Sequence, residues 1–183
     1  MRQALRDWQL QNFDSGLLGE AELLHRAEKA HTTLYAYIRN PETYPLEAYL
    51  EASELAKAPS SDDHSQLVSL LESADSGIRY WGVLGLTSLN KPSDKEVLEP
   101  LLDDASHEVR AFAANALLRH GVSDKAIKAL REMLGGDSYA ILSVLNVIDW
   151  TGTGAEFQVP LEKLSSDTGY VGRMARHILK DSN

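Results

Sequence analysis

The six histidines are the residues that first suggest metal binding or general-base catalysis. They stand at His25, His31, His64, His107, His120 and His177. Two metal ligands on one helix face need a spacing such as i, i+4, and no two of these histidines have it. We therefore interpret them as surface or capping residues. His120 precedes Gly121 at a predicted helix end, where the helix dipole favours a positive charge.

Acidic pairs and a glycine-rich stretch are the other patterns that could hold a ligand. The pairs 62–63 and 103–104 are both Asp-Asp, and neither begins a calcium-binding loop of alternating aspartates. Both precede predicted helices, so we interpret them as caps. The stretch 151–154, Thr-Gly-Thr-Gly, lacks the lysine and the spacing of a phosphate-binding loop. The chain has no cysteine, which excludes thiolate ligands and cysteine nucleophiles. We expect no catalytic residue, no metal site and no cofactor.

Two columns of polar residues recur at a spacing of 31 and are candidates for an interaction surface. Arg79 and Arg110 share one position, either as an anion-binding ladder or as structural partners of aspartates between the helices. The structural alternative is favoured, because Ile141 and Gly172 stand at the next two positions. A second column holds Asn115, Asn146 and His177 after Leu84. It could hold the backbone of a bound peptide, or bridge successive helices.

Two of the tryptophans are expected in different surroundings, Trp81 in the core and Trp150 at the surface. Trp81 and Phe112 share a repeat position, which favours a place in the core. Trp150 stands at a predicted helix end, where an exposed aromatic is a candidate contact for a partner. The candidate interaction surface is therefore Arg79, Arg110, Asn115, Asn146, Trp150 and His177.

The same spacing of 31 residues runs through the elements that must position these side chains. A polar residue opens each copy, an apolar residue follows three positions later, and another apolar residue closes it. The openers are Asp75, Ser106, Asp137 and Thr168, followed by Ile78, Val109, Ala140 and Val171, and then by Leu86, Leu117, Ile148 and Leu179. A polar N-cap before an apolar stripe predicts an amphipathic helix. Repetition at this period predicts a solenoid.

The fold expected from this pattern is all-α, a short right-handed α-solenoid of HEAT-like helical hairpins. A helix is predicted over 46–57. Four helix pairs are predicted after it, namely 64–73 with 76–89, 93–102 with 106–120, 123–134 with 138–150, and 155–164 with 168–180. Each hairpin can bury its apolar side only against neighbouring hairpins.

Residues 1–45 differ from the repeats and predict a helical lead-in or linker. Helices are expected over 2–13 and 20–29, and two prolines, Pro41 and Pro45, interrupt the chain before the array. We expect the lead-in to wrap or cap the array of residues 46–183, with both parts forming one structural unit.

Composition narrows the possible partners. The net charge is −9 and the pI is about 5.1, with lysine and arginine scattered, so no nucleic acid is expected to bind. No apolar run reaches the roughly 20 residues of a membrane span. Residues 1–11 lack the apolar core of a signal peptide. A protein or an adjoining domain is the expected partner.

Two stretches together resemble the C-terminal extension of certain bacterial sulfatases. The first runs from Arg-Asp-Trp at 6–8 to Asp-Ser-Gly-Leu-Leu-Gly-Glu at 14–20. The second includes Tyr-Pro-Leu-Glu at 44–47 and the repeat helices at 78–86 and 109–117. In those sulfatases a lead-in and HEAT-like repeats follow an alkaline-phosphatase-like catalytic domain. The resemblance covers nearly the whole chain and implies a downstream module of such a protein.

The catalytic residues of sulfatases have no counterpart in this chain. Their formylglycine motif needs Cys or Ser in a Cys/Ser-x-Pro/Ala-x-Arg run, and none is present. The resemblance therefore implies a non-catalytic module that supports domain packing or protein contacts, exported or periplasmic with its parent enzyme. The alternative is a free-standing HEAT-repeat adaptor, for which the acidic balance favours a basic partner.

Overall fold

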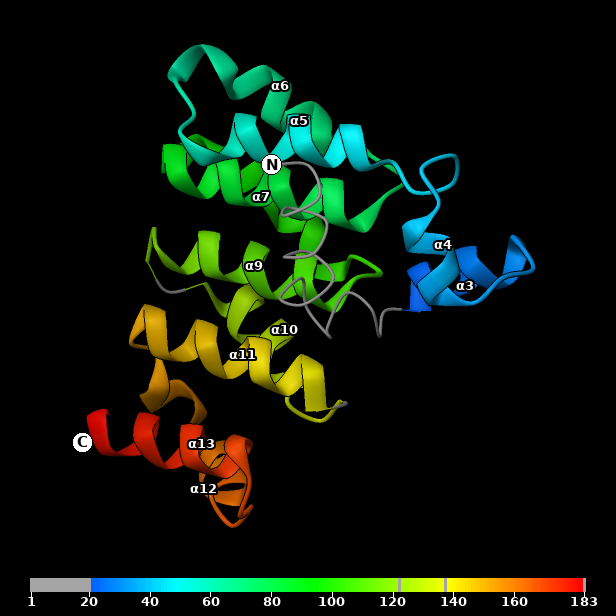
Figure 1. Ribbon diagram of the computed structural model, residues 1–183. Coiled ribbons are helices and arrows are strands. Elements are labelled where there is room, and N and C mark those ends of the chain that lie inside the picture. The colour runs from blue at the N-terminus through cyan, green and yellow to red at the C-terminus, as the bar shows by residue number, and fades with distance from the viewer. Residues whose placement is uncertain (1–20, 122, 137, 183) are drawn as a thin grey trace. The chain divides into compact units, whose positions relative to one another are not determined.

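The computed structural model describes residues 21–121, 123–136 and 138–182, and every regular element in these ranges is a helix. Contacts divide the chain into two compact units, Met1–Leu89 (unit 1) and Asn90–Asn183 (unit 2). Unit 1 contains α3 (Ala21–Lys29), α4 (Leu34–Arg39), α5 (Leu46–Lys57), η1 (Ser61–Asp63), α6 (His64–Leu70) and α7 (Ser76–Leu89). Unit 2 contains η2 (Pro92–Asp94), α8 (Lys95–Leu98), η3 (Glu99–Asp103), α9 (His107–Leu118), α10 (Asp124–Met133), α11 (Ser138–Thr151), η4 (Gly154–Phe157), α12 (Gln158–Leu164) and α13 (Tyr170–Asp181) (Figure 1).

The predicted all-α fold of helical hairpins is confirmed. Both α5 and α7 have the predicted bounds, and α9, α11 and α13 agree with their predicted ranges to within two residues at each end. The N-caps explain two of these starts. The Ser106 hydroxyl accepts a hydrogen bond from the Val109 amide at 3.1 Å, and the Asp75 carboxylate accepts one from the Gly77 amide at 2.9 Å. The predicted cap Asp137 lies outside the described residues.

The fourth predicted cap, Thr168, is wrong. Helix α13 begins two residues later, at Tyr170, with Gly169 as its N-cap. The carboxylate of Asp167 instead accepts hydrogen bonds from the amides of Gly169 at 2.7 Å and Gly172 at 3.4 Å. An aspartate that bonds to the backbone two residues later forms a turn of its own, and this delays the start of the helix.

Three of the four first helices are shorter or more broken than predicted, whereas α10 lies within one residue of its predicted bounds at each end. The segment predicted as a helix over 93–102 is the succession η2, α8 and η3. Pro100 has no amide hydrogen to donate to the carbonyl four residues earlier, so α8 ends at Leu98 and the chain continues as a 3₁₀-helix. The fourth first helix likewise divides into η4 and α12. These first helices therefore contribute only short apolar faces to the core.

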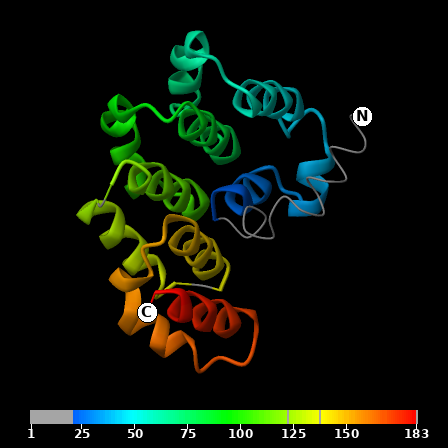
Figure 2. The same ribbon diagram turned by 90° about the vertical axis from the view of Figure 1, so that its left-hand side faces the viewer.

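The core of unit 2 forms between its second helices. Helix α11 packs against α9 on one side and α13 on the other, as Figures 1 and 2 show. The apolar column of the repeat lies here, with Leu117 and Ile148 buried and Leu179, in the last helix, half-buried. Burying such side chains stabilises the stack by roughly 1.5–3 kcal/mol each. Neighbouring hairpins therefore supply the core that no single hairpin has.

In unit 1, helix α7 is packed by both α5 and α6. Glycines permit the close contact: a Cβ on Gly77 would lie 2.3 Å from Cε1 of Tyr49, and one on Gly85 would lie 2.3 Å from Cδ2 of Leu67. Leu67 is fully buried as a result. The lead-in helices α3 and α4 instead form a small core of their own around Ala27, Tyr37 and Ile38.

One polar cluster joins the lead-in to the start of α7. The Arg26 guanidinium donates to the Asp75 carboxylate and, at 2.7 Å, to the carbonyl of Ala74. The Tyr49 hydroxyl donates to the other oxygen of the same carboxylate. The Tyr44 ring stacks on the Tyr49 ring, with centroids 5.0 Å apart. The buried carboxylate that caps α7 therefore also holds α3 and α5 in place. Residues 1–20 of the predicted lead-in lie outside the described residues.

The cluster changes the acidity of its two tyrosines. Burial raises the pKa of Tyr44 from 10.0 to about 12, although its hydrogen bond with Tyr49 opposes the shift. The pKa of Tyr49 is raised further, because of burial first and the negative Asp75 beside it second. Both hydroxyls therefore keep their protons in the folded protein at pH values where an unfolded chain loses them.

This shift predicts a loss of stability in alkali. Below pH 10 both states hold the tyrosine protons; above it the unfolded state releases them first, so stability falls as pH rises from about 10 towards 12. The slope due to Tyr44 approaches about 1.4 kcal/mol per pH unit. Urea unfolding across this range should show a shallower slope for Tyr44→Phe than for the wild type. Tyr35→Phe, at an exposed tyrosine, is the matched control, and an unchanged slope in Tyr44→Phe would contradict the assignment.

Candidate interaction surfaces

The two arginines of the first column make the same hydrogen bond in the two units. Arg79 in α7 donates to the carbonyl of Ser73 at 2.8 Å, and Arg110 in α9 donates to the carbonyl of Asp104 at 2.6 Å. Each acceptor lies six residues before its arginine, in the turn between the first and second helix. Arg79 is buried and Arg110 half-buried. The guanidinium groups thus brace these turns.

The fourth repeat contains an arginine with the same role, displaced by one helical turn. Arg176 in α13 donates to the carbonyls of Ser165 and, at 3.1 Å, Asp167. Gly172 occupies the position equivalent to Arg79, and a Cβ there would lie 1.9 Å from the carbonyl oxygen of Asp167 and 3.1 Å from the Arg176 guanidinium. Glycine therefore makes room for the turn and its arginine. Sequence register alone missed this residue, since it lies four positions out of the column.

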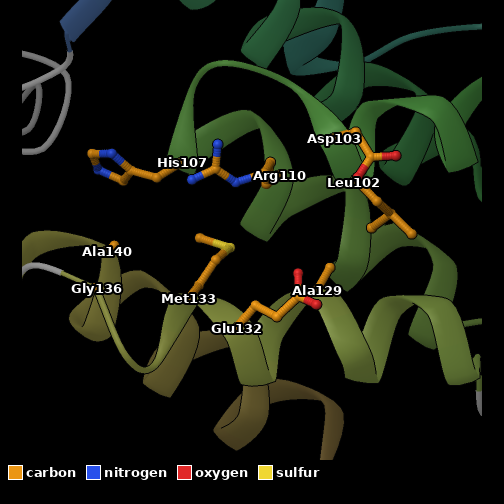
Figure 3. A pocket seen from close by; sticks show the side chains of 9 residues that line it. All are labelled: Leu102, Asp103, His107, Arg110, Ala129, Glu132, Met133, Gly136 and Ala140. Carbon is orange, nitrogen blue, oxygen red and sulfur yellow. The ribbon is translucent and has the colours of Figure 1, made fainter.

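Arg110 also borders a hollow of about 410 Å³ in unit 2 (Figure 3). Its other lining residues include His107, Asp103, Glu132 and Met133. A second hollow of about 420 Å³ shares Asp103 and Glu132 and extends along η3 and α10. Charges of both signs line these hollows, and several are already paired: the Lys125 ammonium lies 3.1 Å from the Glu99 carboxylate. Such a surface suits polar contact with a protein better than capture of one small ion.

A group of the buried His107 and Glu108 with the half-buried Ser143 was not expected from the sequence. The Ser143 hydroxyl donates to the Glu108 carboxylate, and His107 Nε2 lies 3.5 Å from the same carboxylate. In a hydrolase triad the histidine lies between the hydroxyl and the acid and removes the hydroxyl proton. Here the serine and the histidine both lie against the carboxylate, so these contacts do not have the hydroxyl–histidine–acid order of a triad. The group joins α9 to α11.

The second helices of unit 2 carry an exposed face. We define the second-helix face as Phe112 in α9, Asn146 and Trp150 in α11, and His177 in α13. Trp150 is 59% exposed, and its ring meets the Phe112 ring edge-on with centroids 5.9 Å apart. Asn146 is half-buried and lies one helical turn before Trp150.

Two further polar residues complete the description of this region. His177 lies with Nε2 3.6 Å from the Asp149 carboxylate and Nδ1 3.7 Å from the Asp181 carboxylate. It thereby links the ends of α11 and α13. Asn115 is 5% exposed, and its Oδ1 has no hydrogen-bond partner among the described residues. Of the predicted candidates in unit 2, Trp150 and His177 are exposed, Arg110 and Asn146 are half-buried, and Asn115 is buried.

Comparison with known families agrees with this architecture. Residues 64–144 match the family model for HEAT repeats. The chain therefore contains HEAT-like repeats, which are typically non-catalytic helical scaffolds for protein–protein interaction. No curated protein matches the sequence. Within the described residues, no group of three or more His, Asp or Glu side chains is arranged to hold a metal ion, and no helix is long and apolar enough to cross a membrane.

The turn-bracing arginines predict a measurable contribution to stability. Arg110→Ala should lower the free energy of unfolding by about 1–3 kcal/mol, because a charge-assisted hydrogen bond is lost and turn carbonyls lose their donor. Arg119→Ala, at an exposed arginine at the end of the same helix, should change it by less than about 0.5 kcal/mol. Urea denaturation of the two variants tests this, and equal effects would contradict the bracing role.

Gly172→Ala should destabilise the end of unit 2. The added methyl group would collide with the carbonyl oxygen of Asp167, which is backbone and cannot move away as a side chain can. We expect a loss of about 1–3 kcal/mol. Hydrogen exchange should locate the loss in α12 and α13. Gly121→Ala is the control. The φ of Gly121 is +119°, and a Cβ there would meet no atom within 4 Å, so this variant measures the cost of backbone strain without a collision.

Proposed function

We propose that this chain is a non-catalytic helical scaffold that binds a protein through the second-helix face of unit 2. The observation that carries the proposal is the exposure of Trp150, the large aromatic side chain that stands against Phe112 on this face. Aromatic side chains with large contact areas are frequent anchors of protein interfaces. Asn146 and His177 beside it supply polar groups of the kind that surround such anchors.

We further propose that the partner is an adjoining catalytic domain of a sulfatase-like protein. The support is the resemblance of the lead-in and repeats to sulfatase C-terminal extensions, described above. In that arrangement the scaffold packs on the catalytic domain or shapes the access of its substrate, and it is exported with that enzyme. The chain itself contributes no residue to the hydrolysis.

The second candidate is a free-standing adaptor that binds a separate protein. The net charge of −9 favours it, since an acidic scaffold attracts basic partners over distance. The genomic reading frame upstream of Met1 separates the two candidates. A continuous frame that encodes a formylglycine-type motif supports the catalytic partner, and a frame that begins at Met1 supports the adaptor.

Replacing the exposed tryptophan should weaken partner binding without unfolding the scaffold. Trp150→Ala is expected to reduce capture of the partner, or of the catalytic domain supplied separately, by at least about tenfold, because an interface anchor is worth about 2 kcal/mol or more. Tyr35→Ala removes an equally exposed aromatic from unit 1 and is the control. Calorimetric binding titration measures both. If Trp150→Ala and the wild type bind the partner with equal affinity, the second-helix face is not the binding surface.

A further inference from the structure

A groove between α5 and α6 in unit 1 is the feature that the proposed function does not use. Its volume is about 620 Å³. Helix α5 lines it with Ala48, Glu51, Ala52 and Leu55, and α6 and the turn after it line it with Gln66, Ser69, Leu70 and Ser73. Both sets have the spacing i, i+3, i+4, i+7, which places each on one side of its helix. The groove is therefore bounded by two helix faces.

The lining combines apolar side chains with several small residues. Ile78 of α7 also lines the groove, and Leu55, Leu70 and Ile78 are each only half-buried. Small residues at Ala48, Ala52, Ser69 and Ser73 allow another backbone to approach closely. Grooves of this form, walled by helices and lined by apolar residues, are suited to an amphipathic helix.

The repeat itself shows what kind of element is missing here. In unit 2 the first-helix elements of successive hairpins pack together, as α10 does against η3. Helix α5 packs on α7 as a second helix does, but α4, the helix before it, packs with α3 in the small core of the lead-in. Among the described residues, no first helix therefore accompanies α5. The side of α6 that faces α5 presents the groove instead, and terminal repeats of such arrays need a cover for their apolar side.

The negative charge of this part of the chain indicates which charge the partner carries. Residues 46–73 contain six carboxylates and one lysine, so the segment that forms α5 and α6 carries −5 of the net charge of −9. Glu47, Glu51 and Glu54 are exposed and form a stripe along α5, and Glu51 lines the groove itself. Lysine or arginine on a bound helix would complement the Glu51 and Glu54 carboxylates, whereas an apolar helix without basic residues would not.

We propose that the α5–α6 groove binds an amphipathic helix of a partner protein, with small apolar residues facing the groove and lysine or arginine residues facing α5. The helix takes the place of a first helix for α5, which the residues from 21 onward do not supply. This surface belongs to unit 1 and acts independently of the second-helix face of unit 2, so each can be tested without the other.

A helical probe peptide tests the proposal on the full chain. The peptide has about 12 residues, the length of α5, with Ala and Leu at i, i+3, i+4, i+7 and lysine along one flank. Fluorescence anisotropy measures its Kd. We expect saturable binding that weakens as salt rises from about 50 to about 300 mM, because exposed charges are screened. A peptide with glutamate in place of lysine should bind at least about tenfold more weakly.

Variants locate the binding. Ser69→Trp fills the groove from an exposed position and should weaken binding by at least about tenfold, and Glu51→Lys should weaken it by about fivefold. Glu28→Lys, an equal charge change on α3 outside the groove, should leave the Kd within about twofold. Trp150→Ala should also leave it unchanged, which distinguishes this site from the proposed function. Circular dichroism checks that each variant is folded.

Four results would overturn the proposal. In the first, the wild type shows no saturable binding of the peptide, and in the second, Ser69→Trp binds the peptide as well as the wild type. In the third, the lysine and glutamate peptides bind with equal affinity. In the fourth, the chain forms dimers that Ser69→Trp separates. The last result, read by light scattering, would assign the groove to a second copy of this chain instead of a basic partner helix.

Discussion

A short amphipathic hairpin cannot bury its apolar side alone, and the remaining features of this protein depend on that constraint. In unit 2, α11 satisfies it by packing between α9 and α13, and the buried column of Leu117 and Ile148 is the result. In unit 1, α7 satisfies it by packing against α5 and α6 together. Where hairpins stop, apolar surface remains, and the groove between α5 and α6 is such a place.

Stacking of this kind requires that the turns inside the hairpins keep their geometry. Hydrogen bonds from polar side chains hold these turns. Arg79, Arg110 and Arg176 donate to carbonyl groups of the turns before their helices. Asp75 caps α7 and accepts from Arg26 and Tyr49 at the same time. These charged residues are therefore largely committed to the scaffold. Charge in a repeat column is not by itself a sign of ligand binding.

The two proposed binding surfaces, the second-helix face and the α5–α6 groove, differ in their chemistry. The second-helix face presents Trp150 and Phe112 among polar groups, which suits a contact with an aromatic anchor. The α5–α6 groove lies beside an acidic stripe on α5, which suits a basic amphipathic helix. We propose that a scaffold with two such surfaces brings two polypeptides together. The contacts of Ser143 and His107 with the Glu108 carboxylate join α9 to α11 and belong to the scaffold itself.

The sequence by itself determined the helical class, the repeat of 31 residues and most second-helix positions, because apolar periodicity and N-caps are local properties of the chain. It also indicated Trp150 as a surface residue, since a tryptophan at a helix end has few neighbours to cover it. Two local signals explain where the predicted helices were wrong: Pro100 ends α8, and Asp167 forms a turn that delays the start of α13. Tertiary structure decided the rest, beginning with Arg176, which braces the last turn from one helical turn outside the arginine column. The groove likewise depends on how α5 and α6 pack on α7, because contacts between segments far apart in sequence have no local signature.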